Sequence, residues 1–205
     1  MPELVSTHAR PTPKRSYRMV ARADAASATR ERLLVAAWRH FSEQAYESVR
    51  LANVAADAGV SAQTLHTQFG RKADLFVAAW LSFSDREAAR RDAPVGEVET
   101  AVRMIYESYE SAGDAVLRVL AQEDRIPAIR KMTDSGRAGH RSWVAHTFAP
   151  QLRKLSGAAR ERRLVALIAA TDILVWKLLR REMCLPRRAA ERVVIEMIDG
   201  LKEDR

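Results

Sequence analysis

The chain has 205 residues, of which 47% are hydrophobic and 29% charged, with a net charge of +8 and a sequence pI of about 10.1. This balance is ordinary for a globular protein of one or two domains, and its basic excess weakly favours a polyanionic partner. Cys184 is the lone cysteine, so we expect no disulfide framework. The N-terminal residues do not have the pattern of a secretory signal, and no apolar run is long enough for a membrane span. We therefore expect a cytoplasmic protein.

The first segment, residues 1–26, is basic and contains Pro2, Pro11 and Pro13. Six basic residues stand against two acidic ones in residues 1–30, so this stretch carries half of the net charge. We expect residues 1–26 to form a flexible basic arm. Such an arm is either a solubilising tail or a segment that lies along phosphates or in a minor groove.

Residues 27–90 show the 3.6-residue period of amphipathic helices. The pattern predicts a first helix from about residue 28, a short second helix ending at Gly59, a third helix capped by Ser61 and a fourth from about Arg71. The chain has only 8 glycines and 7 prolines and no strand-like alternation of useful length. The expected fold class is therefore all-α.

The junction between the second and third helices fits a helix-turn-helix. Ala55 lets the two helices approach closely, Gly59 allows a tight turn and Val60 fills the angle between them. The outward residues of the third helix are then short hydrogen-bonding residues rather than solubilising charges. Because glutamine can pair with adenine and threonine or alanine can touch a thymine methyl group, we assign base contacts to Ala62, Gln63 and Thr64.

Residues 91–205 predict a second helical domain, whose first residues, about 91–97, form a linker. We expect helices at 98–110, 113–124, 128–132, 137–154 (interrupted near Pro150), 160–183 and from Pro186 to about Leu201. The large or polar residues that could line a cavity between them are Met104, Tyr106, Tyr109, Trp143, Phe148, Asp172 and Trp176. Ordinary core packing is the alternative for each, and Asp172 either has a buried partner or faces water at a helix edge.

The last two long helices have broad apolar stripes that could pair with a second copy as a four-helix interface. The candidate residues are Leu167, Thr171, Leu174, Leu178, Val194, Met197, Ile198 and Leu201. His140 and His146 are spaced poorly for one helical face, and no cysteine pair accompanies them. We therefore expect no metal site and no cofactor.

Residues 29–80 resemble the DNA-binding domain of the TetR family of bacterial transcriptional regulators. The matching residues are Ala36, Ala37, Phe41, Val54, Ala55, Ala58, Gly59, Val60, Ser61, Thr64, Leu65, Phe69, Lys72 and Leu75. The resemblance implies a homodimer on a palindromic operator in double-stranded DNA, in the bacterial cytoplasm and on the nucleoid when bound. It also implies a C-terminal ligand-binding and dimerisation domain, and repression relieved by a small-molecule effector of unknown identity.

Three departures from the family pattern lie where the family contacts DNA phosphate. Arg50 replaces a Ser or Thr cap, His66 replaces a Tyr, and Arg71 replaces a Ser. We therefore expect a steep salt dependence of DNA binding, in which each neutralised phosphate adds about 0.9 to the log–log slope. The assigned phosphate contacts are Arg50, Ser61, His66, Thr67, Arg71 and Lys72. A solvated surface role is the alternative for the two arginines, and a capped surface histidine is the alternative for His66.

Two alternative functions remain open beside a ligand-released repressor. One is a DNA-binding dimer whose C-terminal domain binds no ligand. The other is an all-helical enzyme with an incidental helix-turn-helix, but the sequence offers no metal-ligand set, phosphate loop or recognisable nucleophile–base pair. We therefore do not expect an enzyme.

Overall fold

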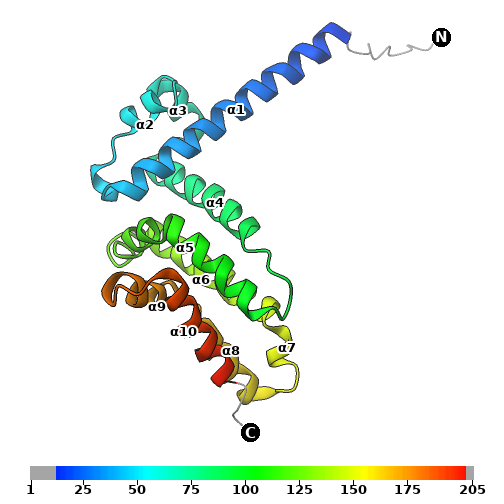
Figure 1. Ribbon diagram of the computed structural model, residues 1–205. Helices are drawn as coiled ribbons and strands as arrows, with labels where there is room; N and C mark the ends of the chain where they lie inside the picture. The colour runs from blue at the N-terminus through cyan, green and yellow to red at the C-terminus, as the bar shows by residue number, and fades with distance from the viewer. Residues whose placement is uncertain (1–12, 202–205) are drawn as a thin grey trace, which may run out of the picture.

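A computed structural model describes residues 13–201, and every regular element in this range is helical, which confirms the all-α fold class (Figure 1). The N-terminal group of helices comprises α1 (Pro13–Glu43), the 3₁₀ helix η1 (Tyr46–Ser48), α2 (Leu51–Asp57), α3 (Ala62–Phe69) and α4 (Lys72–Arg90). The C-terminal group comprises α5 (Val98–Leu120), α6 (Pro127–Thr147), α7 (Ala149–Leu152), α8 (Gly157–Ala170), α9 (Ile173–Lys177), the π-helical η2 (Leu178–Glu182) and α10 (Arg187–Gly200).

Helix α1 begins at Pro13, which corrects the expectation that residues 13–26 belong to a flexible arm. Proline is well placed at a first helical position because its missing N–H would have no partner there. The residues that follow are rich in alanine and arginine, which have high helix propensity. In Figure 1 the N-terminal part of α1 projects beyond the other helices, and residues 20–28 are all exposed. The remainder of the expected arm, residues 1–12, lies outside the described residues.

The predicted helix-turn-helix is confirmed in α2 and α3. Gly59 has a φ of +68°, and the N–H of Val60 donates to the carbonyl of Ala55 at 3.0 Å, which closes the C-terminal turn of α2. Ala55 is 1% exposed, so its small side chain lies in the contact between the helices. The side chain of Arg32 on α1 donates to the carbonyl of Ala58 at 3.2 Å and satisfies another group at the end of α2.

The core of the N-terminal group is continuous with residues of the C-terminal group. Phe41 and Phe76 pack edge to face, with ring centroids 4.6 Å apart, among the aliphatic residues of α1 to α4. Val119, Ile129 and Met132, from α5 and α6, are buried in the same cluster. The N-terminal helices therefore rest on α5 and α6 through an apolar contact.

Helix α5 runs without a break from Val98 to Leu120, so the predicted division into two helices at 98–110 and 113–124 is wrong. Gly113 is not a breaker here, because it is the point at which α5 meets Trp176. A Cβ atom on Gly113 would lie 2.6 Å from the Trp176 ring. The glycine therefore serves close packing and not a turn.

The expected helices at 128–132 and 137–154 are not separate, because they are joined as α6 through Gly136 and Gly139. The interruption expected near Pro150 is confirmed, since α6 ends at Thr147 and the short α7 begins at Ala149. The helix predicted at 160–183 is instead divided into α8, α9 and η2. Asp172 causes the division, because it is the N-cap of α9 and its carboxylate accepts from the N–H of Leu174 at 2.8 Å.

Four of the eight expected interface residues lie inside their own protomer and are corrected to core residues. Leu167, Thr171, Val194 and Ile198 are all 1% exposed or less. They were misassigned because a helical stripe in the sequence does not distinguish the face that packs within the protomer from the face that meets a second copy. Leu174, Leu178 and Met197 are 59%, 45% and 44% exposed, and Leu201 is half-buried.

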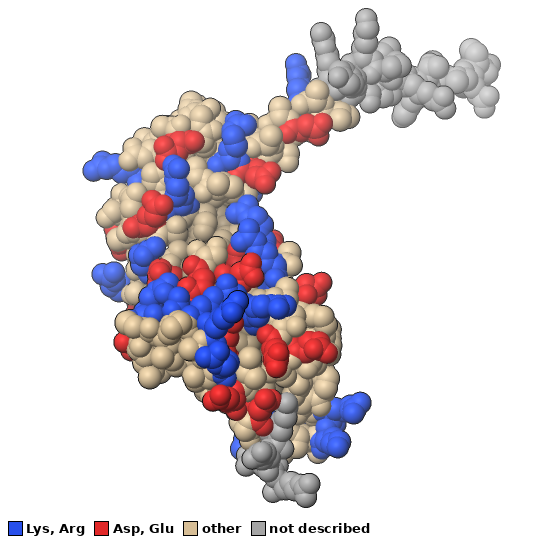
Figure 2. Space-filling model, in the orientation of Figure 1, with Lys and Arg blue, Asp and Glu red and all other residues tan. Residues whose placement is uncertain are grey.

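Charged side chains of both signs are interspersed on the face shown in Figure 2, and they gather in the middle of this view. Several form pairs between helices of the C-terminal group. Arg180 of η2 contacts Glu110 of α5 at 2.5 Å, and the neighbouring Arg181 contacts Asp114 at 3.0 Å. Arginine side chains of the C-terminal group therefore join helices to one another. Among residues 13–201, no helix combines the length and apolar character that a membrane crossing needs.

Substituting Gly113→Ala should destabilise the protein, because the added methyl group must displace the buried Trp176 ring. We expect a loss of about 1–3 kcal/mol in the free energy of unfolding. The matched control is Gly139→Ala in α6, where no atom lies within 4 Å of the new Cβ. This control should gain about 0.5–1 kcal/mol through helix propensity. Denaturant titration measures both, and equal effects of the two variants would contradict the packing role of Gly113.

Candidate nucleic-acid interface

The outer face of α3 carries the predicted base contacts. Ala62 and Gln63 are exposed at the first turn of the helix. Ser61 is the N-cap, as predicted, and its hydroxyl accepts from the N–H of Thr64 at 3.1 Å. The Thr64 hydroxyl lies 2.9 Å from that of Ser61 and the residue is half-buried. The fully exposed members of the base-contact set are therefore Ala62 and Gln63.

The two central phosphate candidates on α3 are held by their own helix. The hydroxyl of Thr67 donates to the carbonyl of Gln63 at 2.8 Å. The Nδ1 atom of His66 lies 3.1 Å from the carbonyl of Gly70, the residue after the helix. Because a carbonyl only accepts, Nδ1 of His66 must carry a proton. In the neutral ring Nε2 is then a bare acceptor, and only the doubly protonated ring can donate to a phosphate.

Lys72, at the start of α4, lies against the segment that precedes α2. Its ammonium group donates to the carbonyl of Glu47 at 3.2 Å and lies 4.7 Å from the centre of the Tyr46 ring. Burial lowers the pKa of Lys72, and the nearby Glu47 carboxylate offsets part of this effect. The side chain is thus half-buried and oriented before any DNA is bound.

The remaining phosphate candidates stand at helix starts. Arg50, Ser61 and Arg71 are the N-cap residues of α2, α3 and α4. Neither arginine caps its helix with its side chain, so N–H groups at these helix starts remain available to an anion. Arg71 forms an exposed ion pair with Asp74 at 3.1 Å, and its hydrogen bond lowers the pKa of Asp74. The helix-turn-helix and the start of α4 therefore bring the predicted phosphate contacts together around α3.

Sequence reasoning missed three residues that support this face. Tyr46 underlies Lys72, Arg32 bonds to the end of α2, and the guanidinium of Arg30 lies 4.4 Å from the centre of the Phe69 ring. Both arginines belong to α1 and contact residues distant in sequence. No local pattern could have identified them, since they differ from the surface arginines of α1 only in these contacts.

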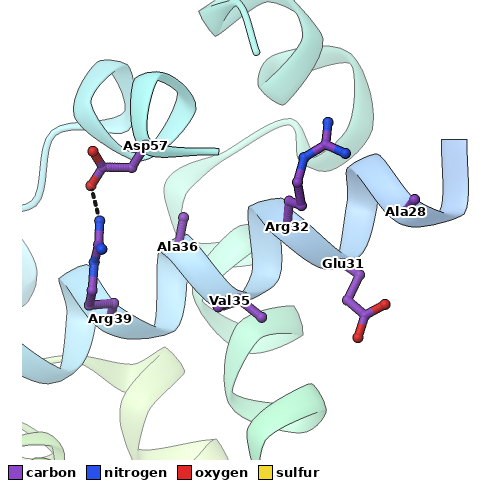
Figure 3. A pocket seen from close by; sticks show the side chains of 7 residues that line it. All are labelled: Ala28, Glu31, Arg32, Val35, Ala36, Arg39 and Asp57. Atoms are coloured by element: carbon purple, nitrogen blue, oxygen red, sulfur yellow. Dashed lines mark hydrogen bonds and ion pairs between the residues drawn. The ribbon is translucent and has the colours of Figure 1, made fainter. Parts of the chain in front are cut away.

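A groove of about 500 Å³ lies between α1 and the end of α2 (Figure 3). It is lined by Ala28, Glu31, Arg32, Val35, Ala36, Arg39 and Asp57. Asp57 is paired with both Arg39 and His40, and the hydrogen bond from His40 is the main cause of its lowered pKa. The pairs joining α1 to α2 thus already occupy the Asp57 carboxylate of this groove.

The seven residues predicted to line a ligand cavity lie mainly in the core of the C-terminal group. Tyr106, Tyr109, Phe148 and Trp176 are buried, while Met104 and Trp143 pack partly buried against them. Asp172 caps α9. None of the seven lines the groove beside α1 or the second surface groove, near Val95 and Pro150.

Polar atoms without partners lie among these core residues. The Nε2 atom of His140 is 3.1 Å from the hydroxyl of Thr171, but its Nδ1 atom is buried and makes no hydrogen bond within residues 13–201. The hydroxyl of Tyr106 is also buried without a partner in this part of the chain. Burial, followed by the charge of Arg91, lowers the pKa of His140. Over residues 13–201, no group of three or more His, Cys, Asp or Glu side chains is arranged to hold a metal ion.

Comparisons with known proteins agree with this geometry. A sequence profile of bacterial regulatory proteins of the tetR family matches residues 33–79. No curated protein sequence matches the chain. The match confirms the resemblance to the TetR family over residues 33–79, which include the helix-turn-helix.

Solved structures of regulators share the fold of most of the chain. A putative transcriptional regulator from Pseudomonas aeruginosa PAO1 has a TM-score of 0.68 at 17% identity, over 85% of this chain and 90% of that one. GusR from Salmonella enterica has a TM-score of 0.68 at 21% identity, over 85% and 95%. A putative TetR-family transcriptional regulator from Rhodococcus sp. has a TM-score of 0.66 at 18% identity, over 86% and 100%. The likeness includes the C-terminal helices and extends the shared fold beyond residues 33–79.

Proposed function

We propose that this protein is a sequence-specific DNA-binding transcriptional regulator, and that it is a homodimeric repressor released from a palindromic operator by a small-molecule effector. The observation that carries the proposal is the exposed first turn of α3, surrounded by the starts of α2 and α4 with their cationic residues. The tetR-type match over the same helices and the fold that most of the chain shares with solved regulators support it.

In this proposal α3 enters the major groove and reads base edges. Gln63 pairs with an adenine and Ala62 touches a thymine methyl group, while Thr64 contributes at the edge of the contact. Arg50, Ser61, His66, Thr67, Arg71 and Lys72 hold phosphates and fix the register of the helix. In this arrangement the base contacts determine sequence specificity, and the phosphate contacts contribute affinity without sequence preference.

Dimerisation through α8, α9 and α10 would place two copies of α3 about one DNA turn apart, roughly 34–36 Å. Val165 of α8 is 51% exposed, and Leu174, Leu178 and Met197 are also largely exposed. Such large apolar side chains on neighbouring helices favour a second copy of the chain as the partner. Leu201, half-buried at the end of α10, would lie at the edge of this interface.

We place the effector at the polar residues between α4, α5, α6 and the start of α9. Arg91, Tyr109, His140, Trp143 and Thr171 meet there through short contacts: Tyr109 donates to the carbonyl of Thr171 at 3.0 Å, and Trp143 donates to that of Arg91 at 2.8 Å. The unpartnered Nδ1 of His140 is the group that a ligand would satisfy. An effector here would carry a polar hydrogen-bonding group beside an aromatic or apolar body.

A DNA-binding dimer without an effector is the second candidate function. It is favoured by the closed packing of Tyr106, Phe148 and Trp176, each 1% exposed or less. The two candidates share the same DNA contacts and differ only in the C-terminal core. A compound that raises the melting temperature of the protein and lowers its operator affinity, with both effects abolished in His140→Phe, would establish the effector.

Selection of bound sequences from a random duplex pool, at near-physiological salt, tests the DNA-reading function. We expect one palindromic motif, because a twofold dimer presents two identical α3 helices. Gln63→Ala should relax the preference at one position in each half-site, by about 1–3 kcal/mol of discrimination. Asn53→Ala, at an exposed residue of α2, is the control. Failure of the unmodified protein to enrich any motif would refute operator reading.

The proposed interface predicts that Val165→Glu combined with Met197→Glu yields a monomer, because buried like charges oppose association. The control is Val95→Glu, which changes a similarly exposed valine between α4 and α5. Sedimentation velocity distinguishes the two states, and the monomer should also lose most of its operator affinity. A double variant that still sediments as a dimer would place the interface elsewhere.

A further inference from the structure

The segment between α1 and α2 is held by a side chain of the C-terminal group. This segment, residues 44–50, contains η1 and is named the connector. The N–H of Tyr46 donates at 2.8 Å to the Oε1 atom of Gln122, which lies in the turn directly after α5. No side chain of the connector caps η1, so Gln122 supplies the acceptor that the connector lacks.

The amide of Gln122 is fixed in this orientation. Its Nε2 atom donates to the carbonyl of Arg118 at 2.8 Å, and Gln122 is only 7% exposed. Rotating the amide would place its N–H₂ group against the N–H of Tyr46 and leave two groups unsatisfied. Gln122 is therefore a built acceptor for the connector.

A second bond reinforces the attachment from the same turn of α5. The Nε atom of Arg118 donates to the carbonyl of Ser42, near the end of α1, at 2.6 Å. Together, Arg118 and Gln122 hold the backbone on both sides of the point where α1 ends and the connector begins. The position of the connector is thus set by α5 as well as by α1.

The opposite side of the connector positions a proposed DNA contact. Lys72 lies over the ring of Tyr46 and donates to the carbonyl of Glu47. The Tyr46 ring is packed against Phe41 and Phe76, with centroids 5.7 and 5.4 Å away. Tyr46 therefore joins Gln122, through its backbone, to Lys72, through its ring.

We propose that Gln122 is a positioning residue for DNA binding, and that α5 sets the affinity for the operator by holding Tyr46 and thereby Lys72. This inference rests on the proposed function, because it assumes that Lys72 holds a phosphate. The attachment of the connector to Gln122 would also allow a movement of α5 to regulate DNA affinity. A change that draws the end of α5 away from the connector removes the support of Lys72 without altering α3.

Loss of the Gln122 hydrogen bond would leave each protomer with one positioned cation fewer for DNA binding. Without Gln122 the N–H of Tyr46 has no acceptor, and the connector can shift toward solvent to reach water. The ammonium of Lys72 then follows the Tyr46 ring and the Glu47 carbonyl. Base contacts stay in place, since the turn at Gly59 and the cap at Ser61 do not touch Gln122.

The test uses Gln122→Met in the full chain, which keeps the side-chain volume and removes both hydrogen bonds. We expect operator affinity to fall about twofold to tenfold. The log–log salt slope should decrease by about 0.9 for each phosphate that is no longer neutralised. The preferred sequence should not change. Gln151→Ala, which removes another glutamine amide of the C-terminal group, is the control and should leave affinity and slope unchanged.

A double-mutant cycle with Lys72→Ala distinguishes positioning from general destabilisation. In the Lys72→Ala background, Gln122→Met should cause no further decrease in affinity. An equal decrease in both backgrounds, or unchanged affinity and slope for Gln122→Met, would overturn the proposal. Gln122→Ala replaces Gln122→Met if the latter does not fold. A random-sequence duplex still reports the slope if no operator is selected, so failure of operator reading is distinguishable from failure of this inference.

Discussion

The tight turn at Gly59 is the constraint on which the DNA-facing side of the molecule depends. Its left-handed backbone, with φ of +68°, allows the N–H of Val60 to reach back to Ala55 while the chain reverses direction. A side chain at this position would be strained even though space is available. Ser61 begins α3 two residues later, so the direction of α3 is fixed almost entirely by this turn. Arg32 and Arg30, from α1, then hold the end of α2 and the side of α3.

The N-terminal helices do not stand alone, because α5 and α6 supply part of their core. Val119, Ile129 and Met132 bury their side chains beneath α1 and α4. Two hydrogen bonds from α5 hold the backbone next to this apolar contact. A shift of α5 would thus change the environment of the connector before it disturbs the helix-turn-helix turn. Such an order of effects would suit a regulator, since DNA affinity could change while α3 keeps its conformation.

Local patterns predicted the parts of the structure that are determined locally. Gly59 and Ser61 have strong conformational and capping preferences, so the helix-turn-helix and its boundaries followed from a few residues. Most errors occurred where a distant residue decides, as at Gly113, which continues a helix because Trp176 needs its space. Likewise the burial of Leu167 and Val194, and the bond from Gln122 to Tyr46, depend on tertiary packing that one sequence does not reveal. Asp172 is a local exception, because it ends one helix by capping the next.

The charges of the candidate interface are largely engaged before DNA arrives, which changes how its affinity should be understood. Lys72 is held by the Glu47 carbonyl and Arg71 by Asp74, so binding a phosphate exchanges one partner for another. The gain from each exchange is smaller than that from a free cation, because part of the desolvation has already occurred. Arg50 differs, since its side chain makes no hydrogen bond or ion pair within residues 13–201 and stands exposed at the start of α2. In the proposed complex the pre-engaged cations would therefore contribute mainly orientation, and Arg50 with the helix starts would contribute most of the attraction between α3 and the phosphate backbone.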